Sequence, residues 1–305
     1  MNQNYQFSIF IPSWNNLPFL KICVDSIRKN SAANHQIIVH VNEGTDGTLQ
    51  WVKEQPDIDY TYTPKNAGVC ISMNMMRTKA SHPYIYFVND DMYMLPGWDI
   101  ALFEELDRLD NQTGFYLSSS AIQPHEAPHP GTGVLADYGD CEDNFREDDL
   151  LREYKQYIIK DWQGATRPPC LVHRDMWDII GGYSIEFSPG YGSDPDFSAK
   201  LYMVGVRHFK GLGNSLTYHF ESKTTASVKS NDYRLQFLLK WGIKNSTFRN
   251  QVTRMGQPWN NDSYIAYHGK TSLKEKLFFI WARLIAAKKI LTCDNKIISG
   301  NKSSL

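Results

Sequence analysis

Short apolar segments alternate with helix-like segments over the first hundred residues. Four of them have the length and apolar content of buried strands: Phe7–Ile11, Gln36–Val41, Tyr60–Thr63 and Tyr84–Val88. Helical periodicity lies between them, over residues 17–28, around Trp51 and Val52, and over residues 69–80. This alternation predicts a parallel sheet with crossover helices. We expect the first strand to end at Pro12, because proline has no N–H to donate to a neighbouring strand.

The middle of the chain interrupts this pattern. Residues 123–149 carry prolines, glycines and then an acidic run without clear periodicity. We expect a long loop or excursion there, which could serve as a lid or an acceptor loop. Beyond it, the pattern predicts ordered structure over residues 162–172 and helical segments at 175–180, 197–204, 237–241 and 273–291.

Composition narrows the class of protein. The 305 residues include 32 basic and 33 acidic side chains, so a net charge of −1 gives no drive toward nucleic acid. The five cysteines are scattered without a close pair, which indicates neither a zinc cluster nor a disulfide framework. The sequence shows neither a basic leader nor an apolar run long enough to cross a bilayer. We therefore expect a cytoplasmic enzyme.

The first candidate chemistry follows the strand that ends at Val88. Asn89, Asp90 and Asp91 come directly after it, and ligands of parallel sheets bind beyond the carboxyl ends of strands. Adjacent carboxylates repel each other unless a cation or several donors neutralise them, so the pair favours a hard divalent metal. A solvated turn that caps the next helix explains the residues equally well.

The order of several segments favours the metal site over the solvated turn. The segments IFIPSWNN, VNEGTDGT, KNAGVCISMN and FVNDDM resemble, in order and spacing, the nucleotide-sugar half of a GT-A glycosyltransferase of family 2. The resemblance continues through residues 181–183, SPGYGSDPDFSAKLYMVG and residues 217–219, and covers roughly residues 6–225.

The resemblance implies a fold and a domain plan. It implies an α/β, Rossmann-like GT-A fold, with a mainly parallel central sheet flanked by helices and a helical C-terminal extension. Residues 1–225 would form the glycosyltransferase domain. Within it, residues 1–100 would bind the nucleotide-sugar and residues 101–225 would carry the acceptor and catalytic half. Residues 226–305 would form the extension.

The resemblance also implies a metal and a donor site. In the family, the acidic triplet holds the donor diphosphate through Mn²⁺ or Mg²⁺. Asn89 stands at the first acidic place, so Asn89 and Asp90 would contact the donor and Asp91 would be the metal ligand. His219 would complete the metal shell or contact the phosphates. Asn89 contributes no charge to a cation, which is a departure from the family pattern.

Further donor-binding residues follow from the same alignment. They are Pro12, Ser13, Asn15, Glu43, Lys65, Asn66 and Gly68. Glu43 would accept hydrogen bonds from a uracil or a guanine, so the base stays open, and Glu43 could instead cap the following helix. Lys65 is almost equally well explained as a solvated surface lysine.

The catalytic candidate is Asp194. The segment Ser193–Asp196 resembles the family's Glu-Asp-x-Asp segment, and inversion at a sugar carbon needs a base for the acceptor proton. Asp196 would sit in the first turn of a helix and serve as a helix acid or as an acceptor contact. Trp162, Gly164 and Tyr191 are the other acceptor candidates, because aromatic faces pack on sugar rings.

The last helix combines apolar and basic side chains. Leu277, Ile280, Trp281 and Leu284 alternate with Lys276, Arg283, Lys288 and Lys289. This pattern fits a peripheral contact of residues 273–291 with the inner face of a membrane, and fits core packing or a dimer contact equally well. The oligomeric state stays open.

Three classes of function remain, and the leading one is an inverting, metal-dependent glycosyltransferase of cell-surface polysaccharide or lipo-oligosaccharide synthesis. It would move a sugar from a nucleoside-diphosphate-sugar, with a UDP-sugar favoured, to a hydroxyl of a glycan or glycolipid. A retaining transferase or a nucleotidyltransferase on the same fold is the second. A catalytically inactive nucleotide-sugar or glycan binder is the third, and the retention of Asp91 and Asp194 argues against it.

Overall fold

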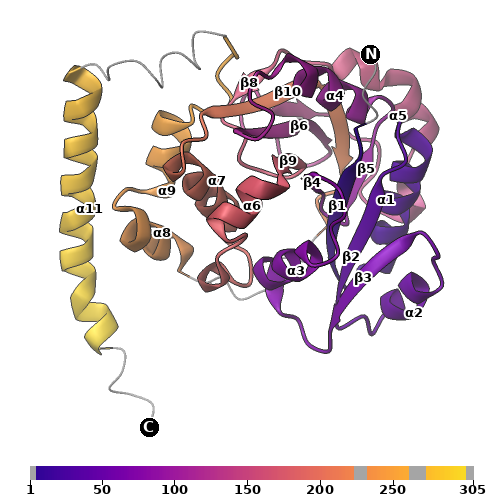
Figure 1. The fold of residues 1–305 in the computed structure, drawn as a ribbon, viewed down its shortest axis with the longest axis horizontal. Coiled ribbons are helices and arrows are strands. Elements are labelled where there is room, and N and C mark those ends of the chain that lie inside the picture. Colours follow the sequence, from indigo (N-terminus) through magenta and orange to yellow (C-terminus); the bar gives the residue numbers. More distant parts are fainter. Residues whose placement is uncertain (1–4, 223–231, 261–272, 300–305) are drawn as a thin grey trace.

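A ten-stranded mixed sheet forms the centre of the computed structural model, which describes residues 5–222, 232–260 and 273–299 (Figure 1). Its strands are β1 Phe7–Trp14, β2 Gln36–Asn42, β3 Ile58–Thr63, β4 Tyr84–Phe87, β5 Met92–Met94, β6 Phe115–Gln123, β7 Gly133–Leu135, β8 Trp162–Gln163, β9 Cys170–His173 and β10 His208–His219. The order is β3-β2-β1-β4-β9-β6-β10-β5, with β7 beside β6 and β8 beside β10. The first four strands pair in parallel, as predicted.

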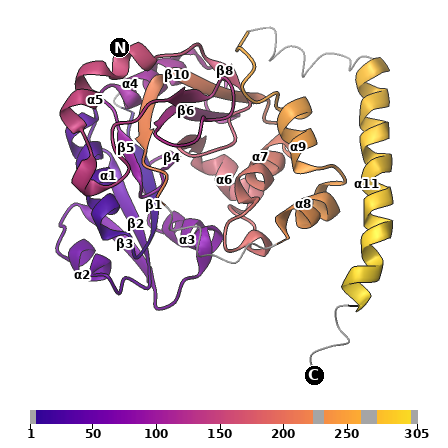
Figure 2. The ribbon, with the colours of Figure 1, turned by 180° about the vertical axis from the view of Figure 1, so that it is seen from behind.

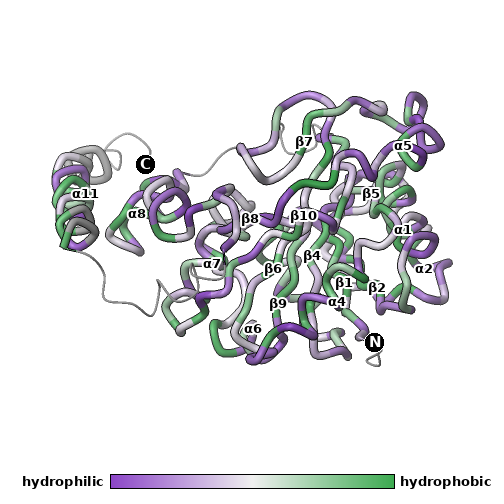
Figure 3. The backbone as a smooth tube through the Cα atoms, turned by 90° about the horizontal axis from the view of Figure 1, so that it is seen from above, coloured by the Kyte–Doolittle hydropathy of each residue, from purple (hydrophilic) through white to green (hydrophobic). Residues whose placement is uncertain are grey.

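Helices cover both faces of the sheet. They are α1 Leu17–Asn30, α2 Thr48–Lys53, α3 Gly68–Arg77, α4 Trp98–Arg108, α5 Glu147–Glu153, α6 Arg174–Ile180, α7 Ser193–Met203, α8 Tyr233–Trp241, α9 Asn245–Thr247 and α11 Leu273–Ser299. Alternation along β1 divides the core in two, because successive strand residues point to opposite faces. Phe7 and Ile9 join the layer of α1, α2 and α4, whereas Phe10 joins the layer of α3, α6 and α7. Figure 3 shows hydrophobic colour gathered along the central strands.

The first strand does not end at Pro12, so that prediction was wrong. β1 continues to Trp14, and Pro12 lies opposite His40 of β2. Pairing with β4 ends earlier, where Phe10 lies opposite Phe87. Beyond Phe10, β1 therefore has a partner strand on one side only, and proline is tolerated at such an edge.

The excursion at residues 123–149 contains more regular structure than its sequence indicates. β7 pairs in parallel with β6, and a 3₁₀ turn at Glu142–Asn144 leads into α5. The aromatic ring of Phe145 stacks on Tyr218 at 5.8 Å and meets Phe220 edge-on at 4.8 Å. Local periodicity could not predict this, because the partners lie more than 70 residues away.

Helix α7 begins four residues earlier than its periodicity predicts, at Ser193 instead of Phe197. Gly192 precedes it with a φ of +83°, a left-handed conformation that glycine adopts at little cost. Asp194 and Asp196 therefore both lie in the first turn of the helix.

The C-terminal part of the chain contributes to the same core. Phe237 of α8 and the nearby Phe248 and Val252 belong to the apolar layer that contains α7. Helix α11 stands apart from the sheet beside α8 and α9 in two opposite views (Figures 1 and 2). Its Leu277 and Leu284 are largely exposed.

No helix in the described residues combines the length and the apolar character that a membrane span needs. The contact of residues 273–291 with a membrane surface stays a prediction.

A buried charge cluster fixes β10, the strand that ends at His219. Glu105 of α4 accepts from Lys210 Nζ at 2.7 Å and lies 3.0 Å from His208 Nε2. Lys210 also contacts Asp161 at 3.0 Å. Burial by itself would raise the pKa of Glu105, but His208 and Lys210 outweigh it and lower that pKa to about 2. The cluster therefore ties α4 and the segment before β8 to β10.

We expect Glu105→Gln to lower the free energy of unfolding by about 3 kcal/mol at pH 7, because it leaves the buried Lys210 partly uncompensated. The folded-state pKa of Glu105 is depressed, so its contribution is complete above pH 4.5 and is lost as the pH falls toward 2. Urea unfolding of both proteins from pH 3 to 7 measures this. A difference that does not shrink below pH 4.5 would contradict the assignment.

Candidate active site

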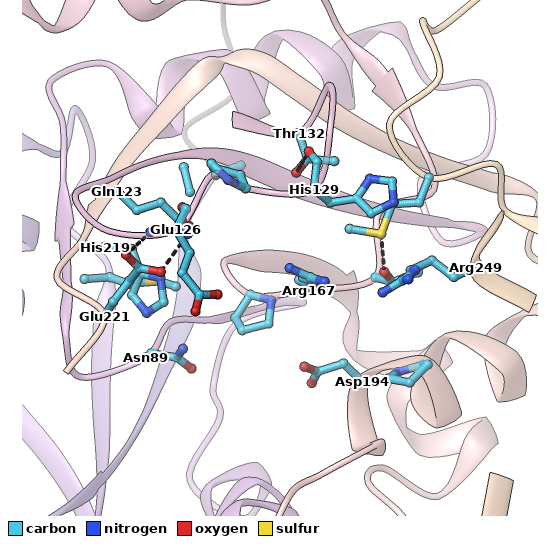
Figure 4. Close-up of a pocket in the computed structure, with 18 of the residues that line it drawn as sticks. Asn89, Gln123, Glu126, His129, Thr132, Arg167, Asp194, His219, Glu221 and Arg249 are labelled. Carbon is cyan, nitrogen blue, oxygen red and sulfur yellow. Dashed lines mark hydrogen bonds between the residues drawn. The ribbon is translucent and has the colours of Figure 1, made fainter. Parts of the chain in front are cut away.

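A cavity of about 680 Å³ opens beside the sheet where β4, β6 and β10 end. Its lining comes from segments far apart in the sequence, including Asn89, Arg167, Asp194, His219 and Arg249. In Figure 4, Asn89, His219 and Glu221 lie at one end and Arg249 at the other, with Asp194 and Arg167 between them. The sequence placed Asn89, Asp194 and His219 in one site, and the structure brings them to one cavity.

Asp91 and His219 are in direct contact. The antiparallel register of β5 and β10 sets His219 opposite Met92, and Asp91 Oδ1 lies 3.3 Å from His219 Nε2. Asp91 Oδ2 accepts from the N–H and the hydroxyl of Ser222 at 2.9 and 3.0 Å. Burial alone would raise the pKa of Asp91, but His219 and Ser222 outweigh it and lower that pKa.

The pKa of Asp90 is shifted in the opposite direction from that of Asp91. Burial and the neighbouring negative charge of Asp91 raise the pKa of Asp90 to about 7. Ser13 Oγ and Asn16 Nδ2, which face Asp90, are buried without a hydrogen-bond partner within normal geometry in the described part of the chain. Polar atoms of this kind are costly unless a ligand or water satisfies them.

Asp91 and His219 are of the side-chain types that bind Mg²⁺ or Mn²⁺. The described residues contain no group of three His, Cys, Asp or Glu side chains arranged around one point. Mg²⁺ and Mn²⁺ need less, because they take one or two carboxylates and fill the remaining shell with water and phosphate oxygens. Asp91 would supply the carboxylate oxygen and His219 the imidazole nitrogen.

A second group of predicted donor residues converges at the ends of β1 and β2. Glu43 accepts from Trp14 Nε1 at 3.0 Å, from Asn15 Nδ2 at 3.2 Å and from the N–H of Asn66 at 3.2 Å. These donors, Trp14 first, lower the pKa of Glu43. Asn15 and Glu43 have positive φ angles of 46° and 60°, and backbone strain of this kind clusters at binding sites. Glu43 does not cap the following helix, whose N-cap is Gly47.

Gly68 connects this group to the segment that carries Asp194. Its φ is +77°, and a Cβ at Gly68 would lie 2.6 Å from Pro189 Cα. The next residue, Val69, donates its N–H to Pro189 O at 2.8 Å. Lys65, in the same loop, is exposed. Gly68 is therefore required by close backbone approach as well as by its own conformation.

Asp194 projects into the cavity from the first turn of α7. Tyr183 donates its hydroxyl to Asp194 Oδ1 at 3.2 Å, and the Tyr183 ring stacks on Phe197 of the same helix at 4.7 Å. Burial raises the pKa of Asp194 to about 6, while Tyr183 and the charge of Arg167 partly oppose that rise. A carboxylate tuned in this way suits proton abstraction near neutral pH.

Asp196 does not line the cavity. Its side chain is fully buried, with Lys240 Nζ at 2.9 Å and Trp241 Nε1 donating to it at 2.9 Å. Lys240 also contacts Glu186 at 2.7 Å. This geometry makes Asp196 the link between α7 and α8, and it leaves no carboxylate oxygen directed toward an acceptor in the cavity.

The remaining acceptor candidates differ in placement. Tyr191 lines the cavity, and its ring stacks on Tyr233 at 6.1 Å. Trp162 reaches the cavity wall although it is 2% exposed, and its Nε1 donates to Ser120 Oγ at 2.9 Å. Gly164 is packed against Met255, where a Cβ would lie 2.5 Å from Met255 Cα. Its glycine character therefore follows from close packing.

Sequence reasoning missed several cavity residues. His129 lies between β6 and β7, Arg167 between β8 and β9, and Arg249 in a π-helical turn at Phe248–Val252. None belongs to a recognisable motif. Glu221 could have been predicted from the sequence, because it lies two residues after His219. It accepts hydrogen bonds from Gln123 Nε2 at 2.8 Å and from the N–H of His125 at 2.9 Å.

Comparison with known proteins supports the fold. The family model of glycosyl transferase family 2 matches residues 8–124, which include β1 to β4 and the segment Asn89–Asp91. No curated protein sequence matches the chain.

Several solved structures share the fold. S. aureus TarS in complex with UDP-GlcNAc superimposes with a TM-score of 0.55 at 14% identity, over 75% of this chain and 63% of that chain. The mannosyltransferase PcManGT from Pyrobaculum calidifontis, in complex with GDP-Man and Mn²⁺, gives 0.51 at 15% identity, over 100% of this chain and 77% of that chain. GalNAc-T7 with UDP, GalNAc and Mn²⁺ gives 0.54 at 12% identity, over 77% and 47%. This chain thus spans less than two thirds of that TarS structure and of GalNAc-T7.

We expect Asp196→Ala to lower the free energy of unfolding by about 2 kcal/mol, because hydrogen bonds to a charged group are lost. The loss is limited because Lys240 still contacts the carboxylate of Glu186. Urea unfolding measures the change. Asp178→Ala is the matched control, since Asp178 pairs with Arg77 at the surface with half of its side chain exposed, where such pairs contribute less than about 1 kcal/mol. Equal losses in the two variants would remove the special role of Asp196.

Proposed function

We propose that the chain is an inverting, metal-dependent glycosyltransferase of family 2 on a GT-A fold, because the model of that family matches residues 8–124. It would transfer a sugar from a nucleoside-diphosphate-sugar to an acceptor hydroxyl on a glycan or glycolipid. The observation that carries the proposal is the partly desolvated carboxylate of Asp194 in one cavity with Asn89 and His219. Synthesis of a cell-surface polysaccharide or lipo-oligosaccharide is the role we propose for it.

The chemistry assigned to Asp194 balances. The acceptor oxygen forms a bond to the sugar's anomeric carbon on the face opposite the leaving group. The hydroxyl proton passes to the Asp194 carboxylate, and the bond to the diphosphate breaks with its electron pair. Tyr183 holds the carboxylate in place through the 3.2 Å hydrogen bond. When Mn²⁺ or Mg²⁺ is bound by Asp91 and His219, it neutralises negative charge on the diphosphate.

We assign the donor to the residues at the ends of β1, β2 and β4. The base and ribose would contact the group Pro12, Ser13, Asn15, Glu43, Lys65, Asn66 and Gly68, and the phosphates would meet Asn89 and Asp90. Ser13 Oγ, which is buried and faces Asp90, supports this placement. The similar structures carry UDP, UDP-GlcNAc or GDP-Man, and we favour a UDP-sugar for this chain.

Two alternative functions make different products. A retaining transferase would give the opposite anomer, and a nucleotidyltransferase would release pyrophosphate instead of a nucleoside diphosphate. An inactive binder would release neither. Anomeric analysis by NMR and assay of the released phosphate species distinguish all of them.

Asp194→Asn should reduce kcat by a factor of about 10² to 10⁴ without weakening the binding of UDP and Mn²⁺, because the amide keeps the shape but accepts no proton. Steady-state kinetics and calorimetry measure the two quantities separately. Asp196→Asn is the control, since that residue lies outside the cavity. A dead Asp196→Asn beside an active Asp194→Asn would place the base on the other carboxylate.

The pH profile of the wild type should fall on the acid side with an apparent pKa near 6, because a raised carboxyl pKa leaves Asp194 protonated and inactive below that value. Tyr183→Phe removes a donor that favours the carboxylate, so its acid limb should move to higher pH. An acid limb near pH 4 in both proteins would exclude Asp194 as the titrating base.

Asp91→Asn should weaken Mn²⁺-dependent binding of UDP by at least about tenfold, because it removes the anionic oxygen assigned to the metal. Calorimetry with and without Mn²⁺ tests this. Asp143→Asn, an exposed acid in the 3₁₀ turn Glu142–Asn144, is the charge-matched control. Unchanged affinity in Asp91→Asn would refute the ligand assignment.

A further inference from the structure

Two arginines and a histidine line the part of the cavity that runs from beside Asp194 to the end away from His219. His129, Arg167 and Arg249 reach it from three separate segments of the chain, as Figure 4 shows. The turn that carries Arg249 is π-helical, a rare conformation that is frequent at functional sites. Three unrelated segments thus deliver the same chemistry to one place.

The two arginines repel each other, and together with burial they keep His129 neutral near pH 7. Burial lowers the pKa of His129, and the charges of Arg249 and Arg167 lower it further. Burial and the charge of Arg249 also lower the pKa of Arg167, although its side chain stays open to the cavity. Such a cluster costs stability unless an anion accompanies it.

No carboxylate of the described residues lies within ion-pair distance of Arg167 or Arg249; Asp194 acts on Arg167 only from farther away. Arg249 donates Nε to the amide oxygen of Asn250 at 3.2 Å, which brings no charge. The cations that hold the fold together behave differently. Lys210 contacts two carboxylates, and so does Lys240. Arg167 and Arg249, which meet no carboxylate of the described residues, are therefore suited to binding a ligand.

The position of the two arginines in the cavity indicates which substrate they would bind. The proposed metal and diphosphate end holds Asn89, His219 and Glu221, and Asp194 separates it from Arg249 (Figure 4). A base must face the acceptor hydroxyl, so a group bound beyond Asp194 belongs to the acceptor. A second cavity of about 540 Å³ shares Tyr233, Asn245 and Arg249 with the first and adds Arg234, Lys244 and Lys289. Positive charge thus continues outward from the site.

We propose that the acceptor carries a phosphate group next to the reacting hydroxyl, and that Arg167 and Arg249 bind this phosphate, with His129 beside them. The proposal rests on the proposed glycosyltransferase function. Two guanidinium groups supply paired N–H donors that match phosphate oxygens, and two or more positive charges match a phosphate better than a single carboxylate. The second cavity would accommodate further phosphates of a longer acceptor.

The test uses the full chain saturated with UDP and Mn²⁺, so that a phosphate probe cannot occupy the donor site. Binding of glycerol 3-phosphate, its methyl phosphodiester and glycerol is measured by saturation-transfer NMR and calorimetry. We expect both phosphates to bind and glycerol to fail. Arg167→Gln with Arg249→Gln should lose at least tenfold in phosphate affinity, while Arg152→Gln, which removes an exposed arginine of α5, should keep it.

Each result has a defined meaning. Binding of the monoester alone indicates a sugar-phosphate acceptor, and binding of the diester as well indicates a phosphodiester-linked chain; both support the proposal. Equal binding of glycerol, or phosphate binding that survives in the double variant, overturns it. Weakened UDP binding in the double variant also overturns it, because the arginines would then serve the donor. Failure of the wild type to bind UDP refutes the proposed function itself, which is a separate outcome.

Discussion

Two neighbouring carboxylates, Asp90 and Asp91, lie where the central strand β4 gives way to β5, and the architecture of the site depends on compensating them. Burial makes their repulsion costly, so one must be neutral or meet positive charge. The structure does both: the pKa of Asp90 is raised to about 7, while His219 and Ser222 hold that of Asp91 low. The antiparallel pairing of β10 with β5 brings His219 into contact with Asp91.

A second charge cluster holds β10 in place. Lys210 of that strand contacts Glu105 of α4 and Asp161, which directly precedes β8. His219 is the last residue of that strand, so its place beside Asp91 is set by the fold itself. Preorganisation of this kind reduces the free energy that ligand binding must spend on ordering side chains.

The cavity is electrostatically divided, and the division suits a transfer between two substrates. Asn89 and His219 lie at one end and Arg249 lies at the other. The partly desolvated carboxylate of Asp194 lies between them, with Arg167 beside it. Residues beyond position 225 contribute directly: Tyr233 and Arg249 line the cavity, and Lys240 anchors the helix that carries Asp194 through Asp196. The helical region after residue 225 thus takes part in the site as well as in the core.

The sequence by itself determined the parallel half of the sheet, because alternating strands and helices are encoded in local hydrophobic periodicity. It also predicted candidate site residues from order and spacing: Asn89 and Asp91 after a strand, and Asp194 at the start of a helix. The tertiary structure alone decided that Asp196 faces Lys240 instead of the cavity, that Phe145 folds the excursion onto Tyr218, and that His129, Arg167 and Arg249 meet. Each of these depends on contacts between residues more than 30 positions apart. Local periodicity carries no information about such contacts, since they form only when separate elements pack on the two faces and the edges of one sheet.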